Sequence, residues 1–474
     1  MFVQQFFIKG IAHSSYLLGG TSTCAIVDPR RDVHIYIDAA EEMGMTITHI
    51  LETHLHADFV SGHLDLAEKT GAGIYVPEKG KCNFKHKSLS DGDTFEIEDM
   101  MIQVLETPGH TPEHISYVVT DRTRGSDPVA VFCGDTLFVG DVGRPDLFPG
   151  MAKKLASNLY ESLHKKLLTL PHFCEVYPAH GAGSLCGRAM GAKRTSTIGY
   201  ELKYNSALRI RDERKFIESL TTAMPPAPDH FTRLSAINRK GPALVETLPA
   251  LELLDPITFK KKTEGKNTIV LDLRSVDAFG GQHVPGAYHI DFGGNFATFA
   301  GWMLPPDRDI LLVAHSFTQA QEASVWLNRV GLDRAIGYLK EGMFGWAKAG
   351  LPMGHVPQLS SEELRQLVVG KEKISLIDVR APREYEENHI KGAVNIPLPD
   401  LRTGYKDFKR KIPIVLICST GHRSSLGTSI LKQQGISTVL NAAGGMTGYS
   451  AAGYASECPV CVAPHVPDFP GKGT

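Results

Sequence analysis

The sequence predicts a multidomain α/β protein, and three observations support this fold class. The chain has 474 residues, which exceeds what one hydrophobic core usually organises and corresponds to roughly three domains. Short apolar runs alternate with Gly-rich turns and helical patterns along the chain. The second half contains an internal repeat with a period of about 100 residues, the length of a small α/β domain.

The repeat is visible in two segments, residues 268–290 and 374–396. Each contains Asp-x-Arg, then His, then Gly-Ala, and is followed by a second apolar run, Ile310–Val313 or Ile414–Ile417. We therefore predict three domains, at 1–248, 249–356 and 357–474, the last with a C-terminal tail. The residues matched between the copies are Asp272 with Asp378, Arg274 with Arg380, and His283 with His389.

Composition excludes several classes of protein. Hydrophobic residues make up 42% and charged residues 22% of the chain, and the formal net charge of -2 argues against nucleic-acid binding. The N-terminus shows no signal-peptide pattern, and no apolar run is long enough to predict a membrane span. The eight cysteines are scattered, so we expect a soluble protein in a reducing, cytoplasmic setting. No pattern assigns a role to the C-terminal pair Cys458 and Cys461, and nothing excludes a homo-oligomer.

Polar clusters follow four apolar, strand-like runs in the first domain. They read T-H-L-H-A-D at 53–58, T-P-G-H at 107–110, C-G-D at 133–135 and Y-P-A-H at 177–180. Loops at strand ends are where an α/β fold presents reactive groups, and four loops carrying His or Asp can converge on one metal ion. Other histidines, such as His114, His164 and His172, are assigned to the surface or to supporting roles.

This set of motifs resembles the metallo-β-lactamase superfamily, and within it the glyoxalase II and persulfide dioxygenase branch. The resemblance implies an αββα sandwich over about the first 245 residues. The superfamily pattern is H-x-H-x-D-H, whose last histidine binds a second metal ion, but this chain has Phe59 there. Because a phenyl ring donates no lone pair, Phe59 argues against a two-metal hydrolase and favours a mononuclear site.

The persulfide dioxygenase resemblance implies that the metal is Fe(II), one per chain, held by His54, His110 and Asp135, with zinc as a substitute ion. Two histidines and one carboxylate are typical of non-haem iron and leave positions open for substrate and O₂. By the same resemblance, His56, Asp58 and His180 lie beside the ligands and orient them or water.

Arg144, in G-D-V-G-R-P-D at 140–146, resembles an arginine that lines the thiol-substrate pocket in this branch. The alternative is a structural ion pair with Asp141 or Asp146. Glutathione-using relatives tend to read H-D-Y where this chain has His180-Gly-Ala, followed by a Gly-rich stretch ending G-S-L-C-G-R. The identity of the thiol carrier therefore stays open.

In the third domain, the apolar run Ile414–Ile417 leads into C-S-T-G-H-R at 418–423. Backbone N–H groups and a helix dipole at such a strand end favour a thiolate nucleophile, and Arg423 adds a fixed positive charge. The loop is one residue shorter than tyrosine-phosphatase loops and resembles a rhodanese loop, which implies that Cys418 carries sulfur as Cys–S–SH. The aligned position in the second domain is Ala314, so that copy is predicted to be inactive.

These observations together predict an iron-dependent persulfide dioxygenase fused to a sulfurtransferase that removes sulfide-derived sulfur. The expected partners are a low-molecular-weight thiol persulfide, thiosulfate and O₂, with no nucleic acid and no membrane. Two alternatives remain: a zinc-dependent thioester or lactone hydrolase with accessory rhodanese domains, and a non-enzymatic carrier of sulfane sulfur.

Overall fold

A computed structural model describes residues 1–454 and 456, apart from positions 189, 223, 225–226, 294, 371–372 and 405–411. Cys458 and Cys461 lie outside the described residues. The chain forms two compact units. The first comprises Met1–Leu248 with Val325–Asp333, and the second comprises Pro249–Ser324 and the chain from Arg334 onward.

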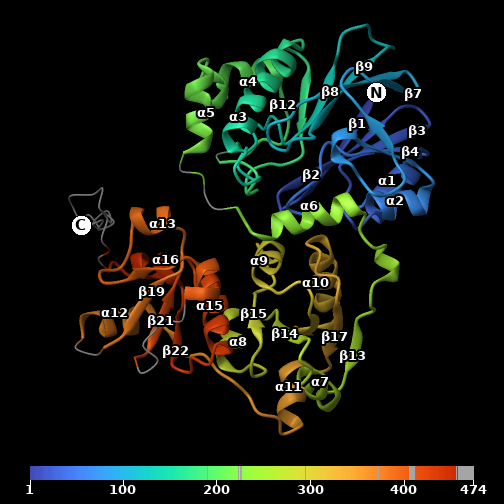
Figure 1. The fold of residues 1–474 in the computed structure, drawn as a ribbon. Helices are drawn as coiled ribbons and strands as arrows, with labels where there is room; N and C mark the ends of the chain where they lie inside the picture. The colour runs from blue at the N-terminus through green and yellow to red at the C-terminus, as the bar shows by residue number, and fades with distance from the viewer. Residues whose placement is uncertain are drawn as a thin grey trace, which may run out of the picture. The chain divides into compact units, whose positions relative to one another are not determined.

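The first unit is built around two six-stranded sheets with helices on their outer faces (Figure 1). Both faces of each sheet are covered, so inner and outer side chains alternate along the strands. On β2 (His13–Gly19), Tyr16 and Leu18 enter the core between the sheets, whereas Leu17 packs with Tyr36 of the helical layer. The αββα sandwich predicted from the sequence is confirmed.

In the first sheet the strands are β1 (Phe2–Ile8), β2 (His13–Gly19), β3 (Thr23–Val27), β4 (Thr46–Leu51), β5 (Gly73–Pro77) and β6 (Lys87–Leu89), in that spatial order. In the second they are β7 (Thr94–Ile97), β8 (Met100–Glu106), β9 (Ile115–Asp121), β10 (Ala130–Gly134), β11 (Glu175–Pro178) and β12 (Ser196–Thr197). The helices are α1 (His34–Glu42), α2 (His63–Thr70), α3 (Ala152–Glu161), α4 (Ile198–Tyr204), α5 (Glu213–Thr221) and α6 (His230–Lys240).

The apolar stretch from residue 16 to residue 28 is divided between two strands, β2 and β3. β2 and β3 pair antiparallel, with Tyr16 opposite Val27. The turn between them is held by the Glu98 carboxylate, which accepts from the backbone N–H groups of Ser22 and Thr23 at 2.8 and 2.6 Å. A Cβ at Gly20 would lie 2.3 Å from a Glu98 oxygen, so any other residue there would displace the carboxylate from this turn.

The second unit contains two five-stranded sheets in which every strand pair is parallel. When the strands of each copy are counted from its own first strand, both sheets have the same spatial order, 1-5-4-2-3. Helices pack against these sheets in each copy (Figure 1). The two parallel-sheet domains predicted from the repeat are therefore confirmed.

The strands of the first copy are β13 (Glu252–Leu254), β14 (Thr268–Asp272), β15 (Tyr288–His289), β16 (Asp309–Val313) and β17 (Ala335–Leu339), and its helices are α7 (Pro256–Thr263), α8 (Val276–Gly281), α9 (Phe296–Met303), α10 (Phe317–Arg329) and α11 (Gly342–Lys348). The strands of the second copy are β18 (Gln358–Leu359), β19 (Ser375–Asp378), β20 (Val394–Asn395), β21 (Ile414–Ile417) and β22 (Val439–Ala442), and its helices are α12 (Ser361–Val369), α13 (Pro382–Glu387), α14 (Leu401–Gly404), α15 (His422–Gln433) and α16 (Gly445–Ala451).

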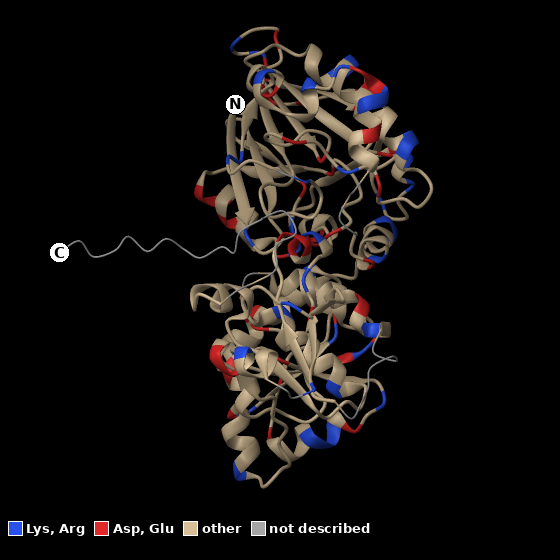
Figure 2. Ribbon diagram, turned by 90° about the vertical axis from the view of Figure 1, so that its left-hand side faces the viewer, with Lys and Arg blue, Asp and Glu red and all other residues tan. Residues whose placement is uncertain are grey.

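Lysine and arginine are interspersed with aspartate and glutamate along the ribbon of both units (Figure 2). This mixture agrees with the small net charge of the sequence. Among the described residues, no helix is both long and apolar enough to cross a membrane.

Candidate functional site

His54, His110 and Asp135 meet in the first unit and are all buried. They follow β4, β8 and β10, so each of the three side chains lies in the loop after a strand. Asp135 Oδ2 lies 3.3 Å from His110 Nε2 and 3.9 Å from His54 Nε2. His110 Nε2 and Asp135 Oδ2 have no hydrogen-bond partner. Since metal–ligand bonds of about 2.0–2.2 Å place neighbouring ligand atoms roughly 3 Å or more apart, this spacing fits a bound metal ion.

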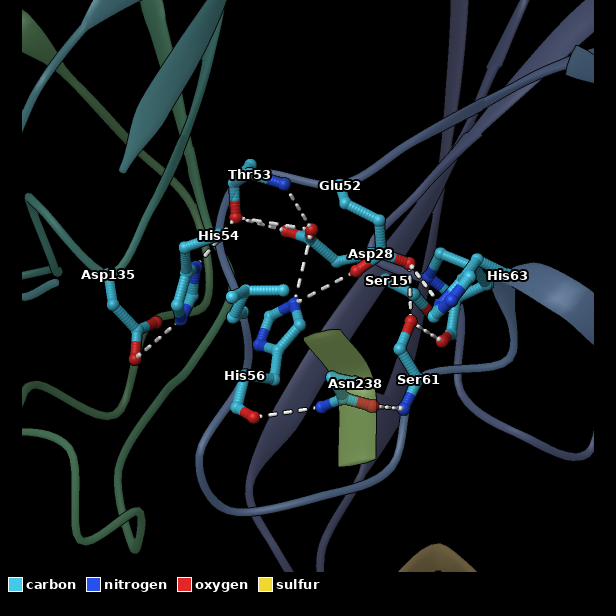
Figure 3. A network of polar contacts seen from close by, with 12 residues as sticks. Ser15, Asp28, Glu52, Thr53, His54, His56, Ser61, His63, Asp135 and Asn238 are labelled. Atoms are coloured by element: carbon cyan, nitrogen blue, oxygen red, sulfur yellow. Dashed lines mark hydrogen bonds and ion pairs between the residues drawn. The ribbon is translucent and has the colours of Figure 1, made fainter. Parts of the chain in front are cut away.

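Contacts behind these side chains orient their donor atoms. His110 Nδ1 donates to the backbone oxygen of Arg144 at 3.0 Å. The proton is therefore on Nδ1, and Nε2 keeps a lone pair that can bind a metal ion. His54 Nδ1 lies 2.9 Å from Thr53 Oγ1, and that hydroxyl donates to Asp28 Oδ2 at 2.9 Å (Figure 3). The Asp28–Thr53 pair therefore sets the orientation of His54.

His56 lies next to His54 but points toward a different pair of carboxylates (Figure 3). Its Nε2 is 3.1 Å from Asp28 Oδ1 and 3.9 Å from Glu52 Oε2. Burial lowers the pKa of His56, but the charge of Asp28 and then that of Glu52 outweigh burial and raise it. Asn238 of α6 donates to the backbone oxygen of His56 at 2.8 Å and fixes the loop. His56 thus lies beside the candidate ligand set and shares Asp28 with it.

His180 sits between Asp58 and Asp135. Its Nδ1 is 2.7 Å from Asp135 Oδ1, and its Nε2 is 2.8 Å from Asp58 Oδ2. Burial lowers the pKa of His180, but Asp135 and Asp58 outweigh burial and raise it well above its usual value. The ring of Phe59 is fully buried against His13 and His56, with ring centroids 4.1 and 4.4 Å away.

Sequence reasoning missed His13 and Cys186 at this site, and it left His114 between a surface and a supporting role, of which the structure shows the second. His114 Nε2 accepts from the backbone N–H of Asp135 at 3.0 Å, and burial lowers its pKa to about 3, so a neutral ring positions Asp135. His13 is buried, and neither ring nitrogen has a hydrogen-bond partner. The thiol of Cys186 lies among the donors of Asp58 and His180. For Cys186 the sequence offered one signal: the Gly-rich stretch after His180 that contains it differs from the H-D-Y pattern of glutathione-using relatives.

Arg144 forms the structural ion pair that was the alternative to substrate binding. Its Nε and Nη2 each donate to Asp146 at 2.7 Å, and Nη1 donates to the backbone oxygen of Leu185 at 3.1 Å. The guanidinium is buried. Its role in lining a thiol pocket stays a prediction.

In the second unit, Cys418 directly follows β21 and is buried at the start of the loop before α15. Its sulfur accepts from the backbone N–H of Gly421 at 3.1 Å and from Ser424 Oγ at 3.4 Å. Gly421 has φ +97°, and this left-handed conformation turns its N–H toward the sulfur. The loop therefore forms a cradle for a sulfur anion.

Arg423 forms an ion pair with the carboxylate of Glu384. Its two terminal nitrogens donate to Glu384 at 2.7 Å each, and Nη2 also donates to Ser419 Oγ at 2.6 Å. Partial burial raises the pKa of Glu384, but the hydrogen bonds and charge of Arg423 outweigh it and lower the pKa to about 2. The positive charge beside Cys418 is thus largely compensated.

A cavity of about 310 Å³ opens beside this loop. Thr420, His422 and Arg423 line one side, and residues of the first rhodanese-like copy, including Asp291 and Phe299, line the other. His422 Nδ1 lies 3.7 Å from Asp291 Oδ2. The first rhodanese-like copy therefore contributes a wall of the pocket beside the loop that begins at Cys418.

Comparison with known proteins agrees with this geometry. The profile of the Metallo-beta-lactamase superfamily matches residues 8–180, and that of the Rhodanese-like domain matches residues 255–349 and 360–452. A solved metallo-beta-lactamase from Staphylococcus aureus is 36% identical, with a TM-score of 0.64 over 72% of this chain and 98% of that chain. The chain belongs to the metallo-β-lactamase superfamily. Two rhodanese-like domains follow its metallo-β-lactamase domain.

The curated relatives of the metallo-β-lactamase domain carry two different activities in their names. The Hydroxyacylglutathione hydrolase of Rhodospirillum rubrum is 36% identical over 162 residues, 34% of this chain and 58% of that protein. Persulfide dioxygenase ETHE1, mitochondrial, of Mus musculus is 27% identical over 201 residues, 42% of this chain and 75% of that protein. The chain is thus a metal-binding enzyme of this superfamily, and its reaction must be argued from the site.

Proposed function

We propose that the metallo-β-lactamase domain is an Fe(II)-dependent persulfide dioxygenase and that the last domain is a sulfurtransferase acting through Cys418. The observation that carries the proposal is the set His54, His110 and Asp135, whose Nε2, Nε2 and Oδ2 atoms lie together and buried. Two imidazoles and one carboxylate are the donor set of non-haem Fe(II), and they leave open positions for substrate and O₂. We assign one iron per chain to this set.

The overall reaction balances as R–S–SH + O₂ + H₂O → R–SH + SO₃²⁻ + 2H⁺, where R–S–SH is a low-molecular-weight thiol persulfide. The iron would supply the binding and activation of O₂ next to the substrate sulfur. The protein residues hold the geometry: Thr53 and the Arg144 carbonyl orient the two imidazoles, and His114 and His180 orient Asp135. Because all of these groups are buried, bulk water is kept from the reacting sulfur.

Cys418 would then handle sulfane sulfur separately. With thiosulfate as donor, Cys418–S⁻ + S₂O₃²⁻ → Cys418–S–S⁻ + SO₃²⁻, so one S–S bond breaks and another forms. The N–H of Gly421 and the hydroxyl of Ser424 stabilise the anionic sulfur before and after transfer. We place the domain boundaries at 248/249 and 356/357 and the protein in the cytoplasm.

The competing proposal is a zinc-dependent thioester hydrolase, supported by the similarity to Hydroxyacylglutathione hydrolase. Phe59 weighs against it, because residue 59 offers no ligand to a second ion of the kind that two-metal hydrolysis uses. The non-enzymatic carrier differs from both because it would neither consume O₂ nor hydrolyse a thioester.

Metal replacement tests the proposal. Metal-free protein is loaded with Fe(II) or with Zn(II), and O₂ uptake with a persulfide and hydrolysis of a thioester are measured for both forms. We expect O₂ uptake by the iron form alone and no hydrolysis by either. His110→Ala should abolish uptake, whereas His172→Ala, which changes an exposed histidine of the same domain, should not. Rapid thioester hydrolysis by the zinc form would overturn the proposal.

A further inference from the structure

A buried histidine of the first rhodanese-like copy contacts the helix that follows the cysteine loop of the second copy. His289 ends β15, and its Nδ1 lies 2.8 Å from Ser425 Oγ on α15. Ser425 directly follows Ser424, whose hydroxyl contacts the sulfur of Cys418. We propose that the first copy positions the Cys418 loop and that His289 is the positioning residue. This inference rests on the sulfurtransferase function proposed above for Cys418.

The direction of this hydrogen bond is fixed by the other nitrogen of the ring. His289 Nε2 lies 2.8 Å from the backbone oxygen of Arg274, and a carbonyl oxygen can only accept. Nε2 therefore carries a proton. Burial lowers the pKa of His289, so the ring is neutral and Nδ1 accepts the proton of Ser425 Oγ. The imidazole thus joins the backbone of the first copy to a helix of the second.

The matching residue of the second copy shows what the histidine adds. His289 and Asn395 have the same register in their sheets, each opposite the aspartate of the Asp-x-Arg motif. The Asn395 amide donates to the carbonyl of Arg380 at 2.9 Å, which matches the bond from His289 to Arg274. The imidazole keeps this local bond and offers a second nitrogen to Ser425. An asparagine is therefore sufficient for the fold at this position, and the histidine serves the contact with α15.

The burial of α15 supports this role independently. Every residue of the helix from Ser424 to Leu431 is buried, and the helix lies beside β15 of the first copy (Figure 1). Ser429, one turn after Ser425, accepts from the backbone N–H of His289 at 3.1 Å. The equivalent of Ser425 on α10 of the first copy is Gln321, which is exposed. The contact is therefore one-sided: the first copy holds the helix behind the cysteine loop, whereas its own equivalent position faces solvent.

The contact acts on the reactive sulfur through the neighbouring serine. Ser424 Oγ lies 3.4 Å from Cys418 Sγ and 3.2 Å from the carbonyl of Gly421, so its one proton can reach either acceptor. A fixed helix start keeps Ser424 Oγ and the N–H of Gly421 within reach of the sulfur. Hydrogen bonds to an anion are stronger than those to a neutral thiol, so they stabilise the Cys418 thiolate and the persulfide anion. Movement of α15 away from the sulfur would slow the transfer.

Two variants of the full chain remove this contact from opposite sides. His289→Asn keeps the donor that Asn395 uses in the second copy but removes the acceptor for Ser425. Ser425→Ala removes the hydroxyl instead, and alanine favours the helix, so this variant answers the question if His289→Asn folds poorly.

Single-turnover sulfite release from thiosulfate measures the first transfer step. In each variant the rate constant at saturating thiosulfate should fall roughly three- to tenfold, the range that one hydrogen bond can transmit. The half-saturating thiosulfate concentration should stay unchanged, because no group that binds the dianion is altered. The double variant should lose no more than either single variant, because both remove the same contact.

Thr428→Val is the matched control. Thr428 is also buried on α15, but its hydroxyl donates to the carbonyl of Ser425 within the helix, so this variant should transfer sulfur at the parent rate.

Alkylation of Cys418 by iodoacetamide, with Cys418→Ser as the background, needs no sulfur transfer and separates the two proposals. It should slow in His289→Asn by the same factor as the transfer. A parent protein that transfers no sulfur, together with slower alkylation in His289→Asn, would sink the sulfurtransferase and keep the positioning role. Parent-like transfer and alkylation in His289→Asn, or additive losses in the double variant, would overturn the inference.

Discussion

The two rhodanese-like copies share a structural core and differ at one loop. In both, a buried arginine pairs with an aspartate two residues earlier: Arg274 Nη2 lies 2.6 Å from Asp272, and Arg380 Nη2 lies 2.7 Å from Asp378. Both arginines also donate to a backbone carbonyl eight residues further on. The copy without a nucleophile keeps this pair, so the Asp-x-Arg motif serves the fold and not the chemistry.

The histidines matched between the copies, His283 and His389, also make the same contacts in both domains. His283 stacks on Phe279 with ring centroids 4.0 Å apart, and His389 stacks on Tyr385 at 3.9 Å. In each case Nδ1 bonds to the backbone oxygen of the aromatic residue, at 2.8 and 2.9 Å. These histidines therefore close a turn before the Gly-Ala dipeptide in both domains.

The differences between the copies concern charge and sulfur. Where the second copy has Cys418 and Arg423, the first has Ala314 and Gln319. The partner of Arg423 is also missing, because the position equivalent to Glu384 is Ala278. The nucleophile and its ion pair are thus absent together, while the scaffold remains. The comparison teaches that a rhodanese fold does not require the cysteine of this loop or its ion pair.

The largest effect should come from the nucleophile itself. Cys418→Ser should lower thiosulfate-to-thiol sulfur transfer by at least about 10³-fold, because an oxygen nucleophile cannot form the persulfide. O₂ uptake with a preformed persulfide should be unchanged, because the proposed iron ligands belong to the other unit. Transfer is followed as sulfite release. Loss of both activities in a folded protein would show that the dioxygenase substrate is carried on Cys418.

The next largest effect should come from breaking the buried Asp-x-Arg ion pair that both copies share. Arg274→Ala and Arg380→Ala should each destabilise their own domain by about 3–5 kcal/mol, because each leaves a buried carboxylate uncompensated. Denaturant unfolding measures this, and it can be resolved by domain. Trp302 and Trp346 lie in the first copy, whereas Trp326 lies in the segment Val325–Asp333 that belongs to the first unit, so tryptophan fluorescence reports these two regions and not the last domain. An Arg274→Ala protein as stable as the parent would break the claim that the motif is structural.

The sequence allowed the fold class, the repeat and the strand ends to be predicted, because hydrophobic periodicity and motif spacing are local properties. The polar clusters that contain His54, His110 and Asp135 were located in this way, and the family resemblance then singled out these three residues as ligands. His13 and Cys186 were not predicted, and the contact of His114 with Asp135 was not specified, because these contacts depend on how loops from different strands approach one another. Glu384 was missed for the same reason: it lies far in sequence from Arg423, the residue whose charge it compensates.

A smaller effect should follow from removing the charge of Glu384. Glu384→Gln keeps one acceptor oxygen for Arg423 but removes the carboxylate charge, so the guanidinium is left uncompensated and KM for the thiosulfate dianion should fall by a few-fold, within about 1 kcal/mol for a partly exposed pair. Glu387→Gln, which alters an exposed carboxylate on the same helix, is the control. A raised KM would indicate that the carboxylate mainly holds Arg423 in position.

The pH dependence of this ion pair follows from the sign of the shift. The pKa of Glu384 is lowered from 4.5 to about 2, so the pair stabilises the folded loop fully above about pH 4.5 and is lost as pH falls through about 2. The effect of Glu384→Gln on KM should therefore be constant between about pH 5 and 8. A KM ratio that varies with pH in this range would mean that another group titrates at the pocket.

The smallest effect should come from restoring the thiol alone. Ala314→Cys places a cysteine at the aligned strand end of the first copy, but no arginine and no paired carboxylate accompany it. In a Cys418→Ser background, this variant should show no measurable sulfur transfer. Activity comparable to the parent would mean that the strand end alone makes a sulfurtransferase and that the rest of the loop is dispensable.

The central claim is that the first domain oxidises a persulfide with O₂, and O₂ consumption measures it most directly. Iron-loaded protein of the Cys418→Ser variant, in which sulfur transfer is removed, is supplied with a low-molecular-weight persulfide in an oxygen-electrode cell. The account predicts that one O₂ is consumed for each sulfite formed and that uptake disappears when the iron is removed. A persulfide that leaves the O₂ concentration unchanged, with iron bound and the protein folded, would contradict it.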